Sequence, residues 1–245
     1  MSASGPDENG QPVLRLHTVS KKYCRTLRRS YWYGILDSVR AVAGGACNRE
    51  RLRPEEFWAV RSFTLTLQRG EIVGLTGPNG CGKTTVLRMI AGIIPPDGGE
   101  IHVRGTVCSL LALGAGFHPH MSVEENVVIN GVLLGYTRNE VRERLGSILE
   151  YAGVVPFARS PAGALSPGLR VRLGFAIAVG LRPDVLLVDE ILSVGDSAFR
   201  SMCLETIRTM SSRAGVVLVS HNPQTIARVC TRVVSLPRLL EGAQK

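Results

Sequence analysis

The sequence of 245 residues predicts an α/β fold built on a mostly parallel sheet. Short apolar strands alternate with helical stretches along most of the chain, and uniformly apolar strands are typical of a parallel sheet covered on both faces. A glycine-rich phosphate-binding pattern also stands between one of these strands and the following helix. With 44% hydrophobic and 20% charged residues, the chain is long enough for one large domain with a buried core.

The elements are expected in a simple order. A polar tail covers residues 1–12 and a single domain covers 13–240, beginning with a strand at 13–17. A helix is expected at 26–42, where Leu27, Tyr31, Ile35 and Val39 recur every four residues. Strands and helices then alternate: a strand from Phe57, a strand at 71–76, a helix at 83–92, a strand at 101–104, helices at 122–134 and 139–151, a helix after Ser166, a strand at 185–188, a helix at 198–210, a strand at 216–219, and a final helix and strand.

Two parts depart from the parallel pattern. The alternation of Phe63, Leu65 and Leu67 places these side chains on one face and predicts an antiparallel β part near the N-terminus. Residues from about 113 to 165 carry little strand signal, which predicts a helical subdomain inserted into the α/β core.

The positive charge of the chain is concentrated in one place. The net charge is +9, with 25 Arg and only four Lys, and nine basic but two acidic residues lie between Lys21 and Arg53. Thus +7 of the excess lies at residues 21–53, within a basic insertion at 21–56. Such an excess is typical of proteins that contact nucleic acid, an anionic membrane surface or an acidic partner.

The six cysteines form no CxxC pair and no metal-ligand spacing, so we expect reduced thiols and an intracellular protein. The first dozen residues are too polar for a signal peptide. No apolar stretch approaches the roughly 20 residues that span a bilayer. A membrane role is therefore expected to depend on a partner or on surface attachment.

A phosphate-binding loop is the first chemical signal. Residues 77–84 read GPNGCGKT and match G-x-x-x-x-G-K-[ST], directly after an apolar strand and before a helix. In this pattern backbone N–H groups surround phosphate oxygens, and the helix N-terminus adds its positive end. We expect Lys83 to reach the β and γ phosphates, Thr84 to ligate Mg²⁺ and Thr85 to add a phosphate contact. The predicted binding residues of this phosphate loop are Gly77, Pro78, Asn79, Gly80, Cys81, Gly82, Lys83, Thr84 and Thr85.

The alternative is a glycine-rich turn that fits by chance, which is expected in only about half a percent of sequences of this composition. A compact Lys ammonium also suits this position better than a guanidinium fork, which explains why an Arg-rich chain keeps Lys83 here.

Two adjacent acids, Asp189 and Glu190, follow the apolar strand at 185–188. Carboxylates at the end of a buried strand are costly unless a cation or a reacting group offsets them. The carboxyl ends of parallel strands share one edge, so these acids are expected near the phosphate loop. We predict that Asp189 holds Mg²⁺, usually through water, and that Glu190 orients and deprotonates the attacking water. The alternative is a solvated loop start.

With these motifs in this order, the chain resembles the nucleotide-binding subunit of ATP-binding cassette (ABC) transporters over residues 13–236. Residues 165–169, LSPGL, stand in place of the family signature LSGGQ, and residues 193–196 correspond to the D-loop. His221 corresponds to the switch histidine that contacts the γ phosphate, and Tyr23 to the aromatic that stacks on adenine. The resemblance implies a P-loop NTPase core of ABC type, ATP and Mg²⁺ as cofactors, and transport-coupled ATP hydrolysis with Glu190 and His221 as catalytic residues.

A narrower resemblance points to the subfamily that exports lipid-linked polysaccharides such as O-antigen, capsule and teichoic acid. It rests on the segments 56–60 (EFWAV), 113–119 (LGAGFHP) and 189–196 (DEILSVGD), and on the long basic insertion before the first of them. The subfamily works with a separate membrane permease, which would carry the substrate.

Two positions depart from the family pattern. Ala112 stands at the Q-loop, where most members have Gln, so one oxygen ligand for Mg²⁺ or water is missing. Pro167 replaces a small residue of the signature, which is favourable after the N-cap Ser166 but removes one backbone donor. Slow or tightly coupled hydrolysis is the resulting hypothesis, and a basal rate equal to that of an Ala112→Gln variant would argue against it.

The resemblance also implies partners. Two copies would form a head-to-tail dimer that encloses ATP, with Ser166 and Gly168 of one copy facing the phosphate loop of the other. The dimer would dock beneath the permease at the cytoplasmic face of the plasma or inner membrane as a peripheral subunit, with the basic insertion against anionic headgroups or permease loops.

Two alternatives share the ATP chemistry. One is a cassette for another lipid or drug exporter, which differs only in cargo. The other is a soluble ATPase acting on nucleic acid or ribosomes, as the +9 charge permits. We expect no nucleic-acid partner, because such soluble proteins commonly carry two cassettes in one chain.

Overall fold

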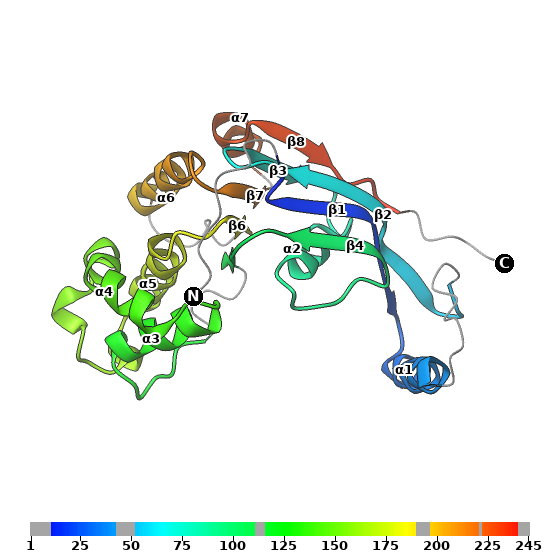
Figure 1. Cartoon of the computed structure of the whole chain (residues 1–245), viewed down its shortest axis with the longest axis horizontal. Coiled ribbons are helices and arrows are strands. Elements are labelled where there is room, and N and C mark those ends of the chain that lie inside the picture. Colours follow the sequence, from blue (N-terminus) through cyan, green and yellow to red (C-terminus); the bar gives the residue numbers. More distant parts are fainter. Residues whose placement is uncertain (1–10, 43–51, 111–115, 190–196, 221, 240–245) are drawn as a thin grey trace.

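The computed structural model describes residues 11–42, 52–110, 116–189, 197–220 and 222–239. Its strands form an antiparallel sheet and a parallel sheet (Figure 1). The antiparallel sheet has the order β2-β1-β4, with β1 (Leu14–Cys24), β2 (Glu56–Leu67) and β4 (Gly98–Val103). The parallel sheet has the order β5-β6-β7-β3-β8, with β3 (Ile72–Thr76), β5 (Val107–Ser109), β6 (Val185–Val188), β7 (Gly215–Val219) and β8 (Arg232–Ser235). The predicted α/β fold, with its antiparallel N-terminal part, is confirmed.

The helices cover both sheets and extend beyond them. They are α1 (Leu27–Val42), α2 (Lys83–Ile90), α3 (Val123–Leu133), α4 (Arg138–Ala152), α5 (Pro167–Gly180), α6 (Ser197–Met210) and α7 (Pro223–Val229), with short 3-10 turns at η2 (Val155–Phe157) and η3 (Ala162–Ala164). No helix in these described ranges is both long and apolar enough to cross a bilayer.

Helix α2 lies between the two sheets. Its Val86 and Leu87 are fully buried with Leu14 and Leu67 of the antiparallel sheet and Val73 of the parallel sheet. This helix carries the phosphate loop at its N-terminus, so packing from both sheets fixes the loop in place.

The other face of the parallel sheet is covered by α5 and α6, where Phe175 and Phe199 pack against Leu186 and Leu218. Helix α5 also contributes Leu173 to a third cluster with α3 and α4. Helix α5, which begins at the predicted signature residues, therefore joins the parallel sheet to α3 and α4.

Helices α3 and α4 begin at capping boxes. The side chains of Ser122 and Thr137 accept from the N–H groups of Glu125 and Glu140, whose carboxylates accept from the cap backbone. Figure 1 shows α3, α4 and α5 grouped on one side of the molecule.

The first strand is longer than expected. Instead of ending near residue 17, β1 continues to Cys24, with Lys22 opposite Trp58 and Tyr23 opposite Phe57 on β2. Residues 18–24 are mostly polar or basic and show no apolar alternation, so the sequence does not indicate a strand there. The strand forms because these residues pair with β2, more than thirty positions away. Tyr23 thus lies within β1 rather than after it, and β5 is a further strand that was not predicted.

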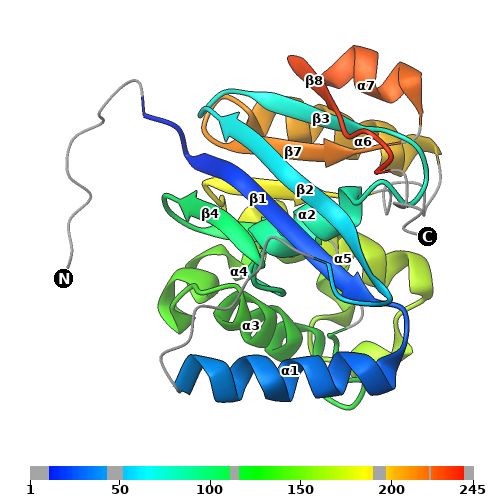
Figure 2. The same ribbon diagram turned by 90° about the vertical axis from the view of Figure 1, so that its right-hand side faces the viewer.

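Helix α1 fills most of the segment between β1 and β2, as the four-residue spacing predicts. It lies beyond one end of the β1–β2 pair, apart from the other helices (Figures 1 and 2). Leu27 and Tyr31 on its stripe are 85% and 77% exposed. Three residues of the apolar stripe, Leu27, Tyr31 and Ile35, are therefore exposed to solvent.

Candidate nucleotide-binding site

The phosphate loop follows β3 at the carboxyl edge of the parallel sheet and leads into α2. Gly77, Gly80 and Gly82 have φ values of 139°, 78° and 99°, a region that side chains with a Cβ adopt only at a cost. Three left-handed glycines turn the chain around a small space, as a loop that surrounds phosphate requires.

Lys83 is buried, with 7% of its surface exposed. Its Nζ donates to the carbonyl oxygens of Gly77 at 2.8 Å and Pro78 at 3.1 Å. An ammonium held inside the loop by neutral acceptors is positioned to exchange them for phosphate oxygens, which bind a cation more strongly.

The N-terminus of α2 is open to an anion. Its N-cap is Gly82, no side chain caps the first N–H groups, and no acidic residue lies in the first turn. Uncapped N–H groups and the positive end of the helix dipole favour a bound phosphate. Thr84 and Thr85 are half-buried beside them.

The second acidic element lies on the same edge. The four residues of β6 are fully buried, and half-buried Asp189 follows them directly. Strand β7 lies between β6 and β3, so the strand preceding position 221 separates the acid from the phosphate loop. Glu190 and His221 themselves lie outside the described residues, as do Ala112 and residues 193–196.

Tyr23 is half-buried on β1 and contacts Phe57, with ring centroids 6.3 Å apart. Two residues beyond Phe57, the carbonyl oxygen of Ala59 lies 2.2 Å from where a Cβ on Gly82 would be. The predicted adenine-stacking ring is thus on the strand pair that supports the phosphate loop.

The predicted signature residues lie at the start of α5. Ser166 caps α5 by accepting from the N–H of Leu169 at 3.3 Å, and Pro167 occupies the first helical position. Ser166 and Gly168 are both exposed, and no atom lies within 4 Å of a Cβ built on Gly168. They form no hydrogen bond with the phosphate loop of the same copy among the described residues. Because Ser166 and Gly168 are exposed at the start of α5, a second copy of the chain could contact them.

The donor set suits magnesium bound together with phosphate. Mg²⁺ prefers a few hard oxygen ligands plus phosphate oxygens, and the Thr84 hydroxyl and Asp189 carboxylate are of this type. Within the described ranges no group of three or more His, Cys, Asp or Glu could hold a metal.

Comparison with known proteins decides the family. A family model described as ABC transporter matches residues 60–193, which include the phosphate loop and the two acids. The chain belongs to the ABC transporter family. The O-antigen export system ATP-binding protein RfbB of Klebsiella pneumoniae is 37% identical to this ABC protein over 229 residues, covering 91% of this chain and 89% of the relative.

A further relative and two solved structures are also similar to this chain. The teichoic acids export ATP-binding protein TagH of Listeria monocytogenes is 36% identical over 181 residues, which cover 74% of this ABC protein and 54% of TagH. The structure of an ATP-binding subunit of an ABC transporter superimposes with a TM-score of 0.71 at 20% identity, covering 91% of this chain and 85% of the other. A dimeric cassette in a post-hydrolysis state, bound to ADP and Pi, gives 0.68 at 21% identity, with 91% and 94% covered. These structures confirm the ABC ATPase fold.

Sequence reasoning missed the support beneath the site. Ala59 carries no chemical group that a motif search would find, and its role comes from a bulge in strand pairing. Glu56 was noted only as part of a family-like segment, although its carboxylate pairs with Lys22. In the sequence, only the alternation of Phe63, Leu65 and Leu67 indicates that this strand packs against the core.

Proposed function

We propose that this ABC protein is the ATP-hydrolysing subunit of an exporter of lipid-linked polysaccharide or cell-wall polymer, working with a separate membrane permease. The observation that carries the ATP chemistry is the buried Lys83 ammonium inside a loop of left-handed glycines, at the open N-terminus of α2. The polymer follows from the names of the O-antigen and teichoic acid relatives, and the separate permease from their being the ATP-binding proteins of export systems.

The residues of the phosphate loop bind the phosphates, and Tyr23 stacks on the adenine. Thr84 and Asp189 hold Mg²⁺, which neutralises phosphate charge when bound. Glu190 takes the proton of the attacking water, and His221 contacts the γ phosphate. Ser166 and Gly168 complete the site of a second copy, so hydrolysis depends on a head-to-tail dimer.

Glu190→Gln tests this assignment. The amide keeps the shape of the carboxylate but cannot accept the proton, so the variant is expected to bind ATP, remain dimeric and release almost no phosphate. Phosphate release and sedimentation with ATP measure the two properties together. Glu143→Gln, at an exposed position of α4, is the matched control and should hydrolyse ATP at the normal rate. Full activity of the Glu190 variant would remove Glu190 as the base.

The organisation that goes with this function is one ABC ATPase domain over residues 13–240, with a polar tail at 1–12 and a helical subdomain at about 113–165. We infer that this subdomain transmits closure of the dimer to the permease. Purification of the native complex, followed by identification of its membrane protein and bound glycolipid, tests the cargo. Recovery of an RNA or ribosome complex instead would favour the soluble alternative.

We further propose that the protein is peripheral at the cytoplasmic membrane face, with α1 against anionic lipid. Leu27, Tyr31, Trp32 and Ile35 form an exposed apolar groove of about 450 Å³ on this helix, and Arg28 lines it. Apolar side chains beside a cation are the combination that binds an anionic interface.

Arg28→Gln tests the membrane contact. One basic residue at an anionic surface contributes about 1 kcal/mol, or about fivefold in affinity. Binding to phosphatidylglycerol vesicles should weaken by that factor, and Arg138→Gln, at an exposed position of α4, should not change it. Equal vesicle binding by both variants and the parent protein would argue against α1 as the contact.

A further inference from the structure

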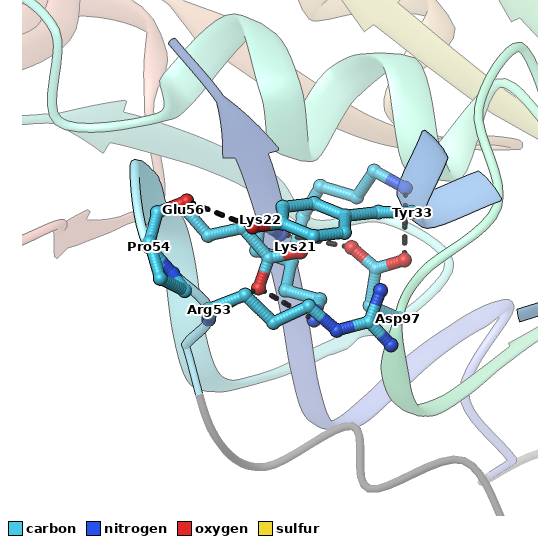
Figure 3. A network of polar contacts seen from close by, with 7 residues as sticks. All are labelled: Lys21, Lys22, Tyr33, Arg53, Pro54, Glu56 and Asp97. Atoms are coloured by element: carbon cyan, nitrogen blue, oxygen red, sulfur yellow. Dashed lines mark hydrogen bonds and ion pairs between the residues drawn. The ribbon is translucent and has the colours of Figure 1, made fainter. Parts of the chain in front are cut away.

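An ion pair that is almost removed from solvent ties β1 to β2. The Nζ of Lys22 lies 2.9 Å from Oε2 of Glu56, and the two side chains are 11% and 7% exposed. The same oxygen accepts a hydrogen bond from the backbone N–H of Arg53 at 2.8 Å (Figure 3). Burying two charges brings little net stability, because desolvation offsets the attraction. Such a pair contributes most by fixing a geometry.

The geometry at stake is the pairing of β1 with β2 beneath the nucleotide site. Lys21 is opposite Val60 but Lys22 is opposite Trp58, so Ala59 is an extra residue at a β-bulge. The bulge turns the Ala59 carbonyl toward Gly82 of the phosphate loop.

On the other side of Lys22, Tyr23 is opposite Phe57, one residue from Glu56. Glu56 itself is opposite Cys24, so the ion pair with Lys22 spans the Tyr23–Phe57 pair, and Lys22 lies between that pair and the bulge at Ala59.

A second set of contacts holds β1 from the opposite side. Asp97 accepts from the backbone N–H of Lys22 at 2.9 Å and from Nζ of Lys21 at 3.3 Å. The Lys21 ammonium also donates to the carbonyl of Pro95 at 2.8 Å and lies 6.0 Å from the centroid of the Tyr23 ring. The strand is thus held at both lysines, and little freedom remains for Tyr23.

The network reaches α1 through the segment before β2. The Arg53 guanidinium lies over the ring of Tyr33 on α1, 4.9 Å from its centroid, and the Tyr33 hydroxyl donates to the carbonyl of Pro54 at 3.4 Å. Figure 3 shows Tyr33, Arg53 and Glu56 meeting beside Lys22. A continuous set of contacts therefore runs from α1 to the nucleotide site.

We propose that Lys22 and Glu56 are positioning residues for nucleotide binding, and that Tyr33 and Arg53 couple them to α1. The pair holds Tyr23 and the Ala59–Gly82 contact in the geometry that binds ATP. Contact of α1 with an anionic membrane then changes the affinity for ATP, and ATP changes the affinity for the membrane by the same factor. The inference rests on the proposed function, since it takes ATP as the ligand and the membrane as the contact of α1.

The first test neutralises the pair without leaving a buried charge alone. Lys22→Met with Glu56→Gln keeps the size of both side chains and leaves an acceptor for the Arg53 N–H. We expect the Kd for a fluorescent ATP analogue to rise about tenfold, or about 1.4 kcal/mol. The full chain is used, and urea unfolding establishes that each variant is folded.

A second ion pair in the same chain supplies the matched control. Glu71 accepts from Nε of Arg232 at 2.6 Å and from the backbone N–H of Gln68, three residues earlier, at 2.9 Å. This pair lies at the start of β3, at the sheet edge away from the phosphate loop. Arg232→Met with Glu71→Gln should change the Kd by no more than about twofold. Equal Kd values for the two double variants would overturn the positioning role.

The coupling to α1 is tested with Tyr33→Leu, with Leu36→Ala as control at an exposed position of the same helix outside the apolar groove. Phosphatidylglycerol vesicles should change the ATP affinity of the parent protein about fivefold. Tyr33→Leu should abolish this change while the Kd without vesicles stays the same, and Leu36→Ala should keep it. A parent protein that ignores vesicles, or a Tyr33 variant that responds like the parent, would overturn the coupling.

These failures differ from a failure of the proposed function. If the parent protein binds no ATP analogue, the ATPase assignment itself falls. If the parent protein binds the analogue, and the double variant of Lys22 and Glu56 has the same Kd as the control double variant, the ATPase assignment stands. In that case only the positioning role is lost.

Discussion

Gly82 offers a sharp test of the phosphate-loop geometry, because its neighbour Gly80 provides a control in the same loop. Gly82→Ala would place a Cβ 2.2 Å from the Ala59 carbonyl oxygen and 2.8 Å from Cγ2 of Val60. Gly80→Ala would meet nothing within 4 Å. The φ values are 99° and 78°, so both alanines adopt a left-handed backbone.

The expected magnitudes follow from this difference. A left-handed alanine costs about 1 to 2 kcal/mol at either position. At Gly82 overpacking against Ala59 adds about 1 to 3 kcal/mol, because backbone atoms must shift to relieve the clash. The gain from a less flexible unfolded chain is common to both variants and cancels in their comparison. Gly82→Ala should therefore be less stable than Gly80→Ala by about 1 to 3 kcal/mol.

Urea unfolding measures the stability difference, and steady-state phosphate release measures the effect on hydrolysis. Moving the loop by about 1 Å is expected to lower the rate of Gly82→Ala about a hundredfold. The Gly80 variant should lose much less, since its side chain points into open space. Equal losses of stability for the two alanines would show that the Ala59 carbonyl does not press on Gly82, and would refute the bulge as support for the loop.

Three further predictions concern the rest of the fold. Asn126 is fully buried and bonds to the backbone of His118, Met121 and Ser122, so Asn126→Ala should lower the free energy of unfolding by at least about 2 kcal/mol, and a smaller loss in urea would contradict this role. Burial raises the pKa of the Cys108 thiol from 9.0 to about 12, so the folded protein keeps the thiol protonated while the unfolded chain ionises. Stability should then fall above pH 9, by up to about 1.4 kcal/mol per pH unit for this thiol, and Cys108→Ala should flatten the slope in a pH series. Thr137→Ala removes the N-cap of α4 and should cost about 1 kcal/mol by the same measurement, unlike an exposed substitution on the third turn of the helix.

The elements that the sequence predicted well are those with a local cause. Strand β6 is uniformly apolar and is bounded by Asp184 and Asp189, and its observed range equals the expected one. Helix α2 starts at Lys83 because the glycine pattern ends there, and α3 and α4 start at capping residues that can be read directly. In each case the signal lies within a few residues of the boundary.

Other features depend on contacts between distant residues. The end of β1 is a strand because Lys22, Tyr23 and Cys24 pair with residues 56–58, and its polar letters carry no apolar alternation. The spacing on α1 predicted a helix, but spacing cannot say what covers the apolar stripe. The site shows the same division: the phosphate loop is a contiguous motif, whereas its support by Ala59 arises from a bulge that no spacing reveals.

The basic residues of the insertion are of two kinds: some are paired with acids, and others are exposed to solvent. Lys21, Lys22 and Arg29 pair with Asp97, Glu56 and Glu55, acids that lie beyond the stretch of nine basic residues. The insertion therefore presents less positive charge to solvent than its nine basic residues imply. Arg28, which lines the apolar groove, accounts for more of the attraction to an anionic membrane.

Salt separates the two kinds. Attraction between an exposed arginine and a membrane is screened over about 10 Å at 0.1 M ionic strength, whereas a pair as buried as Lys22 and Glu56 is screened much less. Raising the salt concentration should weaken vesicle binding but leave the ATP affinity of the free protein nearly constant. The basic insertion thus combines an exposed surface, whose attraction to a membrane depends on salt, with a buried ion pair beneath the nucleotide site that salt affects little.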